Sequence, residues 1–151
     1  MRDVLVREVA RAALQHLDDL PTKHGMPQEH EWTVYAAIVL TNAYTNEAPR
    51  VISCATGTKC TAVTPESNGN ILHDSHAEVL ARRGLVRHLW LEIGKLQKAP
   101  ELDSKLLRRE KSRYELCKGV DLHLYVSDAP CGDATIYEVG QCTVESGHQH
   151  Q

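Results

Sequence analysis

The stretch of residues 74–83 constrains this chain more than any other, because it places His76 and Glu78 at the predicted start of a helix. Residues two apart on an ideal helix point in nearly opposite directions, so these two side chains can share one site only at the helix tip. Ser75 and Glu78 have the spacing of a capping box, and Asp74 is a further candidate cap. The sequence therefore predicts a helix whose first turn carries chemically useful side chains.

The body of this helix is predicted from apolar residues that recur at helical intervals over residues 75–97. They are Val79, Val86, Leu89, Trp90, Ile93 and Leu96. A second helix start is predicted at Cys131, which follows Pro130 after the strand-like run 120–126. Proline suits the first turn of a helix, and a cysteine at a helix N-terminus is biased toward the thiolate. His76 and Cys131 therefore both fall at predicted helix starts.

Imidazole and thiolate are ligand types that zinc prefers at a tetrahedral site with one position open for water. His76 and Cys131 are therefore candidate ligands, and Glu78 is a candidate proton carrier that does not bind the metal. His76-Ala77-Glu78 has the H-x-E form of the zinc-dependent nucleoside and nucleic-acid deaminases, and the later Pro-Cys pair has their order. The alternative is a capped amphipathic helix that begins with His and Glu, since such short patterns often match by accident.

The remaining elements are predicted from hydrophobic patterning. Residues 3–17 carry apolar side chains on one helical side, which predicts an amphipathic helix. Residues 32–41 and 51–56 are rich in strand-forming side chains and would be joined through a hairpin at 42–50. With the strand at 120–126, this order predicts an α/β fold. The 151 residues, of which 42% are apolar, fit one domain that spans the whole chain.

Charge restricts how this chain could meet a nucleic acid. The formal net charge of -3 gives no global basic character, so any such contact must come from a local surface. The candidate basic patch is Lys105, Arg108, Arg109, Lys111, Arg113 and Lys118. The alternative for this run is an ordinary solvated helix or loop face.

Cysteine usage and the N-terminal sequence indicate the compartment. Five irregularly spaced cysteines favour a reducing environment over a disulfide framework. The N-terminus carries no apolar stretch typical of a signal peptide, and no span is long enough to cross a membrane. We therefore expect an intracellular protein, in the nucleus, the cytoplasm or both, with no membrane association and no obligate protein partner.

Several motifs in order resemble one family. The chain is similar to the tRNA-specific adenosine deaminases and, more broadly, to the editase domain that they share with the double-stranded-RNA adenosine deaminases. The motifs are His30-Glu31-Trp32-Thr33, Ala36-Ala37-Ile38-Val39, Gly57-Thr58-Lys59-Cys60, Asp74-Ser75-His76-Ala77-Glu78 with Ala81-Arg82-Arg83, and Pro130-Cys131-Gly132-Asp133-Ala134. The His-Glu-Trp-Thr element favours the tRNA branch.

The resemblance implies a cytidine-deaminase-like three-layer fold with a mixed sheet and with helices that carry the zinc ligands at their N-termini. It implies that His76 and Cys131 bind Zn²⁺ and that Glu78 shuttles protons between the zinc-bound water and the adenine amine. The implied reaction is hydrolytic deamination of adenosine to inosine in tRNA, at or next to the anticodon, with alanine tRNA as one candidate substrate.

The resemblance also implies a second cofactor and a substrate surface. Family members bury an inositol hexakisphosphate, and the positions of two of its ligands are occupied here by Arg82 and Arg83. Planar guanidinium groups suit phosphate because they bind it bidentately. Thr58 and Lys59 match the stretch near the substrate nucleotide, and Val34 falls where the base pocket would be lined.

The chain also departs from the family pattern. The family's third zinc ligand is a cysteine well downstream of the P-C-G-D motif, whereas this chain ends at Gln151. Cys142, His148 and His150 are candidates without support from spacing. We therefore expect a C-terminally incomplete deaminase domain, the N-terminal half of the fold, with little or no activity by itself. The alternatives are a catalytically inactive isoform or fragment, or a relative that deaminates cytosine or a free nucleoside.

Overall fold

The computed structural model describes residues 2–21, 30–60, 71–99, 101, 104–129 and 131. Its elements are α1 (Arg2–Asp18), β1 (Tyr35–Asn42), β2 (Arg50–Thr56), α2 (Ala77–Lys98), β3 (Leu107–Glu110), β4 (Arg113–Leu116) and β5 (Val120–Val126). Both helices predicted inside these ranges are confirmed, as are three predicted strands and the hairpin connection after β1. The first strand begins at Tyr35 rather than at Trp32, so Trp32 lies before the sheet.

Strand β1 is the centre of a three-stranded sheet with the order β2-β1-β5. It pairs with β2 and with β5, and both pairs are antiparallel. Residues 35–40 are all buried, as expected for a continuous apolar run that is covered on both faces. The predicted α/β class is confirmed. The resemblance implied a mixed sheet, and the strand pairs among the described residues are antiparallel.

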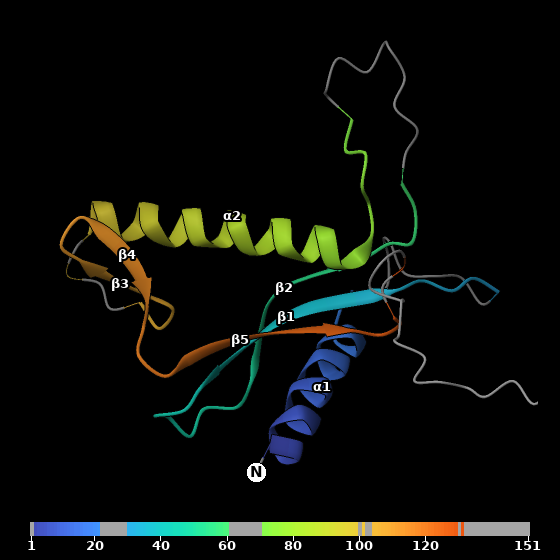
Figure 1. The fold of residues 1–151 in the computed structure, drawn as a ribbon, viewed down its shortest axis with the longest axis horizontal. Coiled ribbons are helices and arrows are strands. Elements are labelled where there is room, and N and C mark those ends of the chain that lie inside the picture. The colour runs from blue at the N-terminus through green and yellow to red at the C-terminus, as the bar shows by residue number, and fades with distance from the viewer. Residues whose placement is uncertain are drawn as a thin grey trace, which may run out of the picture.

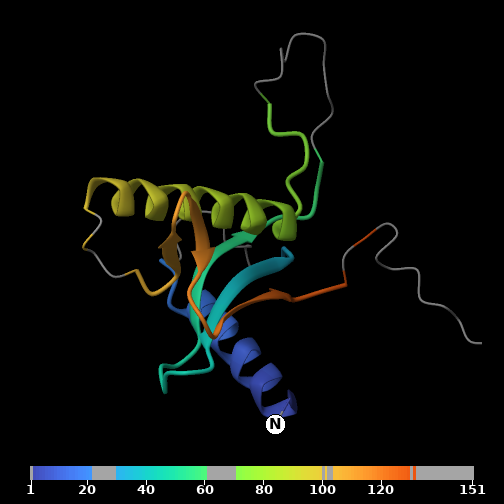
Figure 2. The ribbon, with the colours of Figure 1, turned by 60° about the vertical axis from the view of Figure 1, so that its left-hand side comes forward.

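The two faces of β1 pack against different helices. Successive strand residues point to opposite faces, so Tyr35, Ala37 and Val39 lie in one cluster with residues of α1. Ala36 and Ile38 lie in another cluster with residues of α2. Figure 1 shows α1 and α2 on opposite sides of the sheet, and the rotated view in Figure 2 agrees. The described residues thus form the predicted three layers.

A third apolar cluster joins the C-terminal end of α2 to the β3–β4 hairpin. It contains Leu40, Leu96, Leu106, Leu107 and Val120. Figure 1 shows the hairpin beside the C-terminal end of α2. Since α2 has 22 residues and each adds about 1.5 Å, the C-terminal end of α2 lies about 33 Å along the helix from His76.

The hairpin corrects the interpretation of the basic run as a helix or loop face. Its strands pair antiparallel over four residues each. One of the predicted basic side chains is neutralised there, because Arg108 forms ion pairs with Glu110 and Glu115. Lys105 also pairs with Glu47. The basic patch therefore presents fewer free charges than the sequence suggested.

The buried face of α2 differs in part from the predicted apolar stripe. Ala77, Ala81 and Leu96 are its buried residues. Val86 and Trp90, which were predicted to belong to the apolar face, are exposed. Small alanines at the start of the helix let it lie close to the sheet. Within the ranges that the structure describes, no helix is long and apolar enough to span a bilayer.

Candidate metal centre at the start of helix α2

Three segments distant in sequence are joined by backbone hydrogen bonds where α2 begins. The Gly57 N–H donates to the Val34 carbonyl over 3.1 Å, and the Gly57 carbonyl accepts from the Ala77 N–H over 3.1 Å. The Ser75 N–H donates to the Lys59 carbonyl over 3.1 Å, and Cys60 forms a bridge with Asp74. The segment after β2 therefore holds the segment that carries His76 against the start of β1.

Gly57 is needed in this arrangement because there is no room for a side chain. A Cβ atom at this position would lie 2.0 Å from the Ser75 carbonyl oxygen. The clash is with backbone, so it can be relieved only by moving the segment before α2. The glycine of the Gly-Thr-Lys-Cys motif thus sets how closely the two segments approach.

Replacing Gly57 with alanine is expected to lower the free energy of unfolding by about 1–3 kcal/mol, the usual cost of overpacking. Gly94→Ala is the matched control, because a Cβ at Gly94 meets nothing within 4 Å. This second change should be neutral or stabilise α2 by roughly 0.5–1 kcal/mol. Urea unfolding of the two variants followed by circular dichroism measures both effects. Equal stability of the two variants would contradict the close approach at Gly57.

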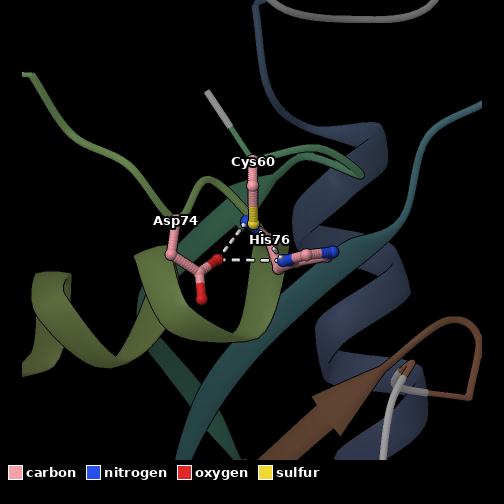
Figure 3. Close-up of side chains that lie close together, drawn as sticks. All are labelled: Cys60, Asp74 and His76. Atoms are coloured by element: carbon pink, nitrogen blue, oxygen red, sulfur yellow. Dashed lines mark hydrogen bonds and ion pairs between the residues drawn. The ribbon is translucent and has the colours of Figure 1, made fainter. Parts of the chain in front are cut away.

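His76 is the N-cap of α2, and no side-chain hydrogen bond caps this helix start. The predicted capping box of Ser75 and Glu78 is therefore wrong. Asp74 instead binds His76 twice through one oxygen, because Oδ1 accepts from the backbone N–H over 3.0 Å and lies 2.9 Å from ring Nδ1. Figure 3 shows the Asp74 carboxylate turned toward His76. Asp74 thus fixes the ring instead of capping the helix.

The Asp74 contact decides which nitrogen of His76 is available. The backbone N–H of His76, together with its ring, holds the pKa of the Asp74 carboxyl below its usual value, so the group is an anion at neutral pH. A carboxylate can only accept, so Nδ1 carries the proton and donates it. When the ring is neutral, Nε2 then bears the free lone pair. Histidines that bind metals commonly donate their other ring N–H to a carboxylate in this way.

The Nε2 side of the ring faces Cys131, although the two residues are 55 positions apart. The Cys131 sulfur lies 3.4 Å from Nε2 of His76. A tetrahedral zinc bound by nitrogen at about 2.0 Å and by sulfur at about 2.3 Å separates these two atoms by roughly 3.5 Å. The structure therefore brings together the two predicted ligands at a spacing that fits a shared zinc ion.

Cys60 is a further donor that the sequence analysis did not assign to the metal. Its sulfur lies 3.6 Å from Nδ1 of His76, on the other side of the ring from Cys131. The ligand atoms of Cys60, Asp74 and His76 lie within 4.8 Å of one another and could hold a metal ion. Figure 3 shows these three side chains converging. The cysteine in Gly-Thr-Lys-Cys was a signal for this, but spacing alone does not relate it to His76.

The two donor sets use different nitrogens of one ring. Binding through Nε2 with Cys131 leaves the Asp74 hydrogen bond intact, whereas binding through Nδ1 with Cys60 would break it. Metal binding through Nε2 and Cys131 requires less rearrangement, because the hydrogen bond to Asp74 already keeps the ring proton on Nδ1. The donors present fit zinc, and the His76–Cys131 pair fits it with the least rearrangement.

The other predicted site residues lie around this centre or along α2. Glu78 is partly buried in the first turn of α2. Thr58 and Val34 are half-buried, and Lys59 is exposed, all in the segments joined to the helix start. Arg82 and Arg83 are exposed on the next turn of α2.

Some predicted features lie outside the described residues. These are the helix after Cys131 and the tail candidates Cys142, His148 and His150. Within the described part of the chain, the fold and the site together define an α/β domain with a His–Cys pair suited to a metal ion at a helix start.

Comparison with known proteins extends this description. The family model of the adenosine-deaminase (editase) domain matches residues 53–151. The chain is 39% identical over 145 residues to the tRNA-specific adenosine deaminase 1 of Drosophila melanogaster, which covers 95% of this chain and 35% of that protein. The corresponding Schizosaccharomyces pombe protein is 38% identical over 137 residues, and the match covers 85% of this chain and 34% of that protein.

The similarity extends to the second branch of the family. The double-stranded RNA-specific editase Adar of D. melanogaster is 40% identical over 108 residues, with 69% of this chain and 16% of that protein covered. The chain belongs to the adenosine-deaminase (editase) domain family, which confirms the resemblance inferred from its motifs. It spans about a third of the length of the two tRNA-specific relatives.

Proposed function

We propose that this chain provides the metal-binding part of an enzyme that deaminates adenosine to inosine in tRNA, at or next to the anticodon. The observation that carries the proposal is the 3.4 Å approach of Cys131 to Nε2 of His76, with Glu78 in the adjoining helical turn. Membership of the editase family and the names of its tRNA-specific relatives support the reaction class.

In this proposal His76 and Cys131 hold Zn²⁺, which when bound supplies a nucleophilic hydroxide at neutral pH by lowering the pKa of water. Glu78 lies two residues after His76 at the helix tip, where it does not need to bind the metal. Its carboxylate accepts a proton from the attacking water and delivers it to the leaving amine of adenine. Asp74 keeps the His76 ring in the tautomer and orientation that this arrangement needs.

The substrate surface is proposed to lie on the segments joined to the start of α2. Val34 is half-buried beside the Ala77–Ala81 cluster, where an apolar side chain can line a base pocket. Thr58 and Lys59 lie between Gly57 and the Cys60–Asp74 bridge and provide polar and cationic groups beside it. A flipped nucleotide needs both kinds of group.

Arg82 and Arg83 are proposed to bind inositol hexakisphosphate. Both guanidinium groups are exposed, one turn after the start of α2. Two adjacent guanidinium groups can bind phosphate oxygens bidentately. An enzyme acting on tRNA would be located in the nucleus or the cytoplasm, with no need for a membrane or an obligate protein partner.

Incubation of the purified protein with unmodified tRNA, followed by nuclease digestion and mass spectrometry of the nucleosides, tests the proposed function. Within the whole enzyme we expect inosine at a position in or beside the anticodon and no uridine formed from cytidine, whereas this chain by itself is expected to form little or no inosine. Alanine tRNA is a suitable first substrate, and a transcript with guanosine at the target position is the control. Conversion of cytidine to uridine would contradict the proposal, as would formation of inosine from free adenosine but not from tRNA.

A further inference from the structure

Trp32 is a large aromatic side chain that the fold leaves in solvent close to the candidate site. It is 74% exposed, although an indole is among the most costly side chains to leave uncovered. It lies before β1 and takes no part in the three apolar clusters of the described residues. Packing within this part of the chain therefore does not explain a tryptophan at this position.

The backbone places Trp32 beside the segments that carry the predicted ligands. Val34, two residues later, accepts the hydrogen bond from Gly57, which in turn binds Ala77 next to His76. Tyr35 exchanges two hydrogen bonds with Ser127, four residues before Cys131: the Ser127 N–H donates to the Tyr35 carbonyl over 2.8 Å, and the Tyr35 N–H donates to Ser127 Oγ over 2.9 Å. Even a fully extended chain separates Trp32 from Val34 by only about 7 Å.

The residues before Trp32 are exposed and polar, which favours a nucleotide over an apolar protein surface as the partner of its ring. Its neighbours His30 and Glu31 are exposed polar residues, and Lys59 presents a cation on the adjoining segment. Trp90 provides the contrast, since it is 68% exposed but lies on α2 near exposed Val86 and Leu91. Trp90 thus lies among exposed apolar side chains of its own helix, whereas Trp32 follows exposed polar residues in the chain.

We propose that Trp32 stacks on the base of a nucleotide that neighbours the reacting adenosine in an unpaired RNA loop. The inference rests on the proposed function, because it needs an extruded nucleotide at the His76 centre. Extruding one nucleotide unstacks its neighbours, and an exposed indole offers one of them a new stacking surface. Stacking is tolerant of base identity, so Trp32 contributes affinity for looped RNA more than sequence specificity.

Binding and kinetics of Trp32 variants test the inference with a tRNA anticodon stem-loop as the probe. Trp32→Ala is expected to weaken RNA binding and to raise KM by roughly 5- to 150-fold, with a much smaller change in kcat. Trp32→Phe keeps a stacking surface and should stay within a few-fold of the natural protein. The far-UV circular dichroism of Trp32→Ala should be unchanged, because the side chain is exposed.

A stem-loop with an abasic site next to the target adenosine identifies the stacked base. The natural protein should lose about as much affinity for the abasic RNA as Trp32→Ala loses for intact RNA. Combining the two changes should cost little more than either alone, because both remove one contact. Independent, additive losses would overturn the inference, as would unchanged binding by Trp32→Ala.

Tryptophan fluorescence provides a readout that does not depend on catalysis. The sequence holds two tryptophans, so Trp90→Phe leaves Trp32 as the single reporter and Trp32→Phe leaves Trp90. RNA should quench the Trp90→Phe protein and leave the Trp32→Phe protein almost unchanged. If Trp32 is shielded from iodide before RNA is added, a protein surface covers it and the inference fails. RNA-dependent quenching without inosine formation would contradict the proposed function while upholding the contact.

Discussion

Glu78→Gln is expected to lower the rate of inosine formation by about 10²–10⁴-fold, the usual contribution of general acid–base catalysis, while the metal content stays unchanged. Glutamine has nearly the same size as glutamate but cannot accept and return a proton. Glu78 is placed two residues after the proposed ligand His76, so the variant loses proton transfer and keeps the metal ligands. Quantifying inosine in tRNA at matched metal loading measures the effect.

Glu8→Gln is the matched control for this change. Glu8 lies on α1, on the opposite side of the sheet from α2, so its replacement should leave the rate within about twofold. Full activity of the Glu78→Gln protein would show that Glu78 takes no part in the reaction. A Glu78→Gln protein that loses the metal would indicate that Glu78 is a ligand and that the proposed division of roles is wrong.

His76→Ala is expected to reduce bound zinc from one ion per chain to almost none and to abolish deamination. The change removes the only imidazole in the proposed ligand set and leaves Cys131 without its partner at 3.4 Å. Native mass spectrometry after dialysis against a weak chelator measures the zinc content directly. His16→Ala, on α1, should retain the ion. Retention of zinc by His76→Ala would place the metal elsewhere in the protein.

Much of the fold was predictable because burial and local pattern agree along its central elements. The run that became β1 is apolar at every position from 35 to 40, and the structure buries it on both faces. The strand at 120–126 and the helix of residues 2–18 follow equally clear patterns. In these segments the local preference and the tertiary environment favour the same structure.

The β3–β4 hairpin was missed because its composition contradicts its structure. Arg and Glu dominate its short strands, which leaves few of the β-branched and aromatic side chains that favour strands, so propensity favoured a helix or loop. The hairpin is held instead by Leu107, buried beneath the end of α2, and by ion pairs of Arg108 with two glutamates. The burial of Leu107 in one cluster with Leu40 depends on residues far apart in the sequence and leaves no periodic signal.

The site was predictable at the level of residue types and less so in its geometry. The motifs named His76 and Cys131 as partners at one site, and the structure places the two side chains 3.4 Å apart although 55 residues separate them. They did not show that Asp74 would bind the His76 ring or that Cys60 would lie 3.6 Å from it. The Cys60 contact follows from the close approach of the Gly57–Cys60 segment to the start of α2, which is a tertiary feature.

The central claim is that His76 and Cys131 share a zinc ion, and zinc-edge X-ray absorption of the loaded protein tests it most directly. We expect an imidazole nitrogen at about 2.0 Å and a thiolate sulfur at about 2.3 Å in the natural protein. Cys131→Ser should lose one sulfur from the first shell, whereas Cys60→Ser should leave the spectrum unchanged. The opposite outcome, with the sulfur lost in Cys60→Ser and kept in Cys131→Ser, would contradict the claim and place the metal on the Cys60–Asp74–His76 side of the ring.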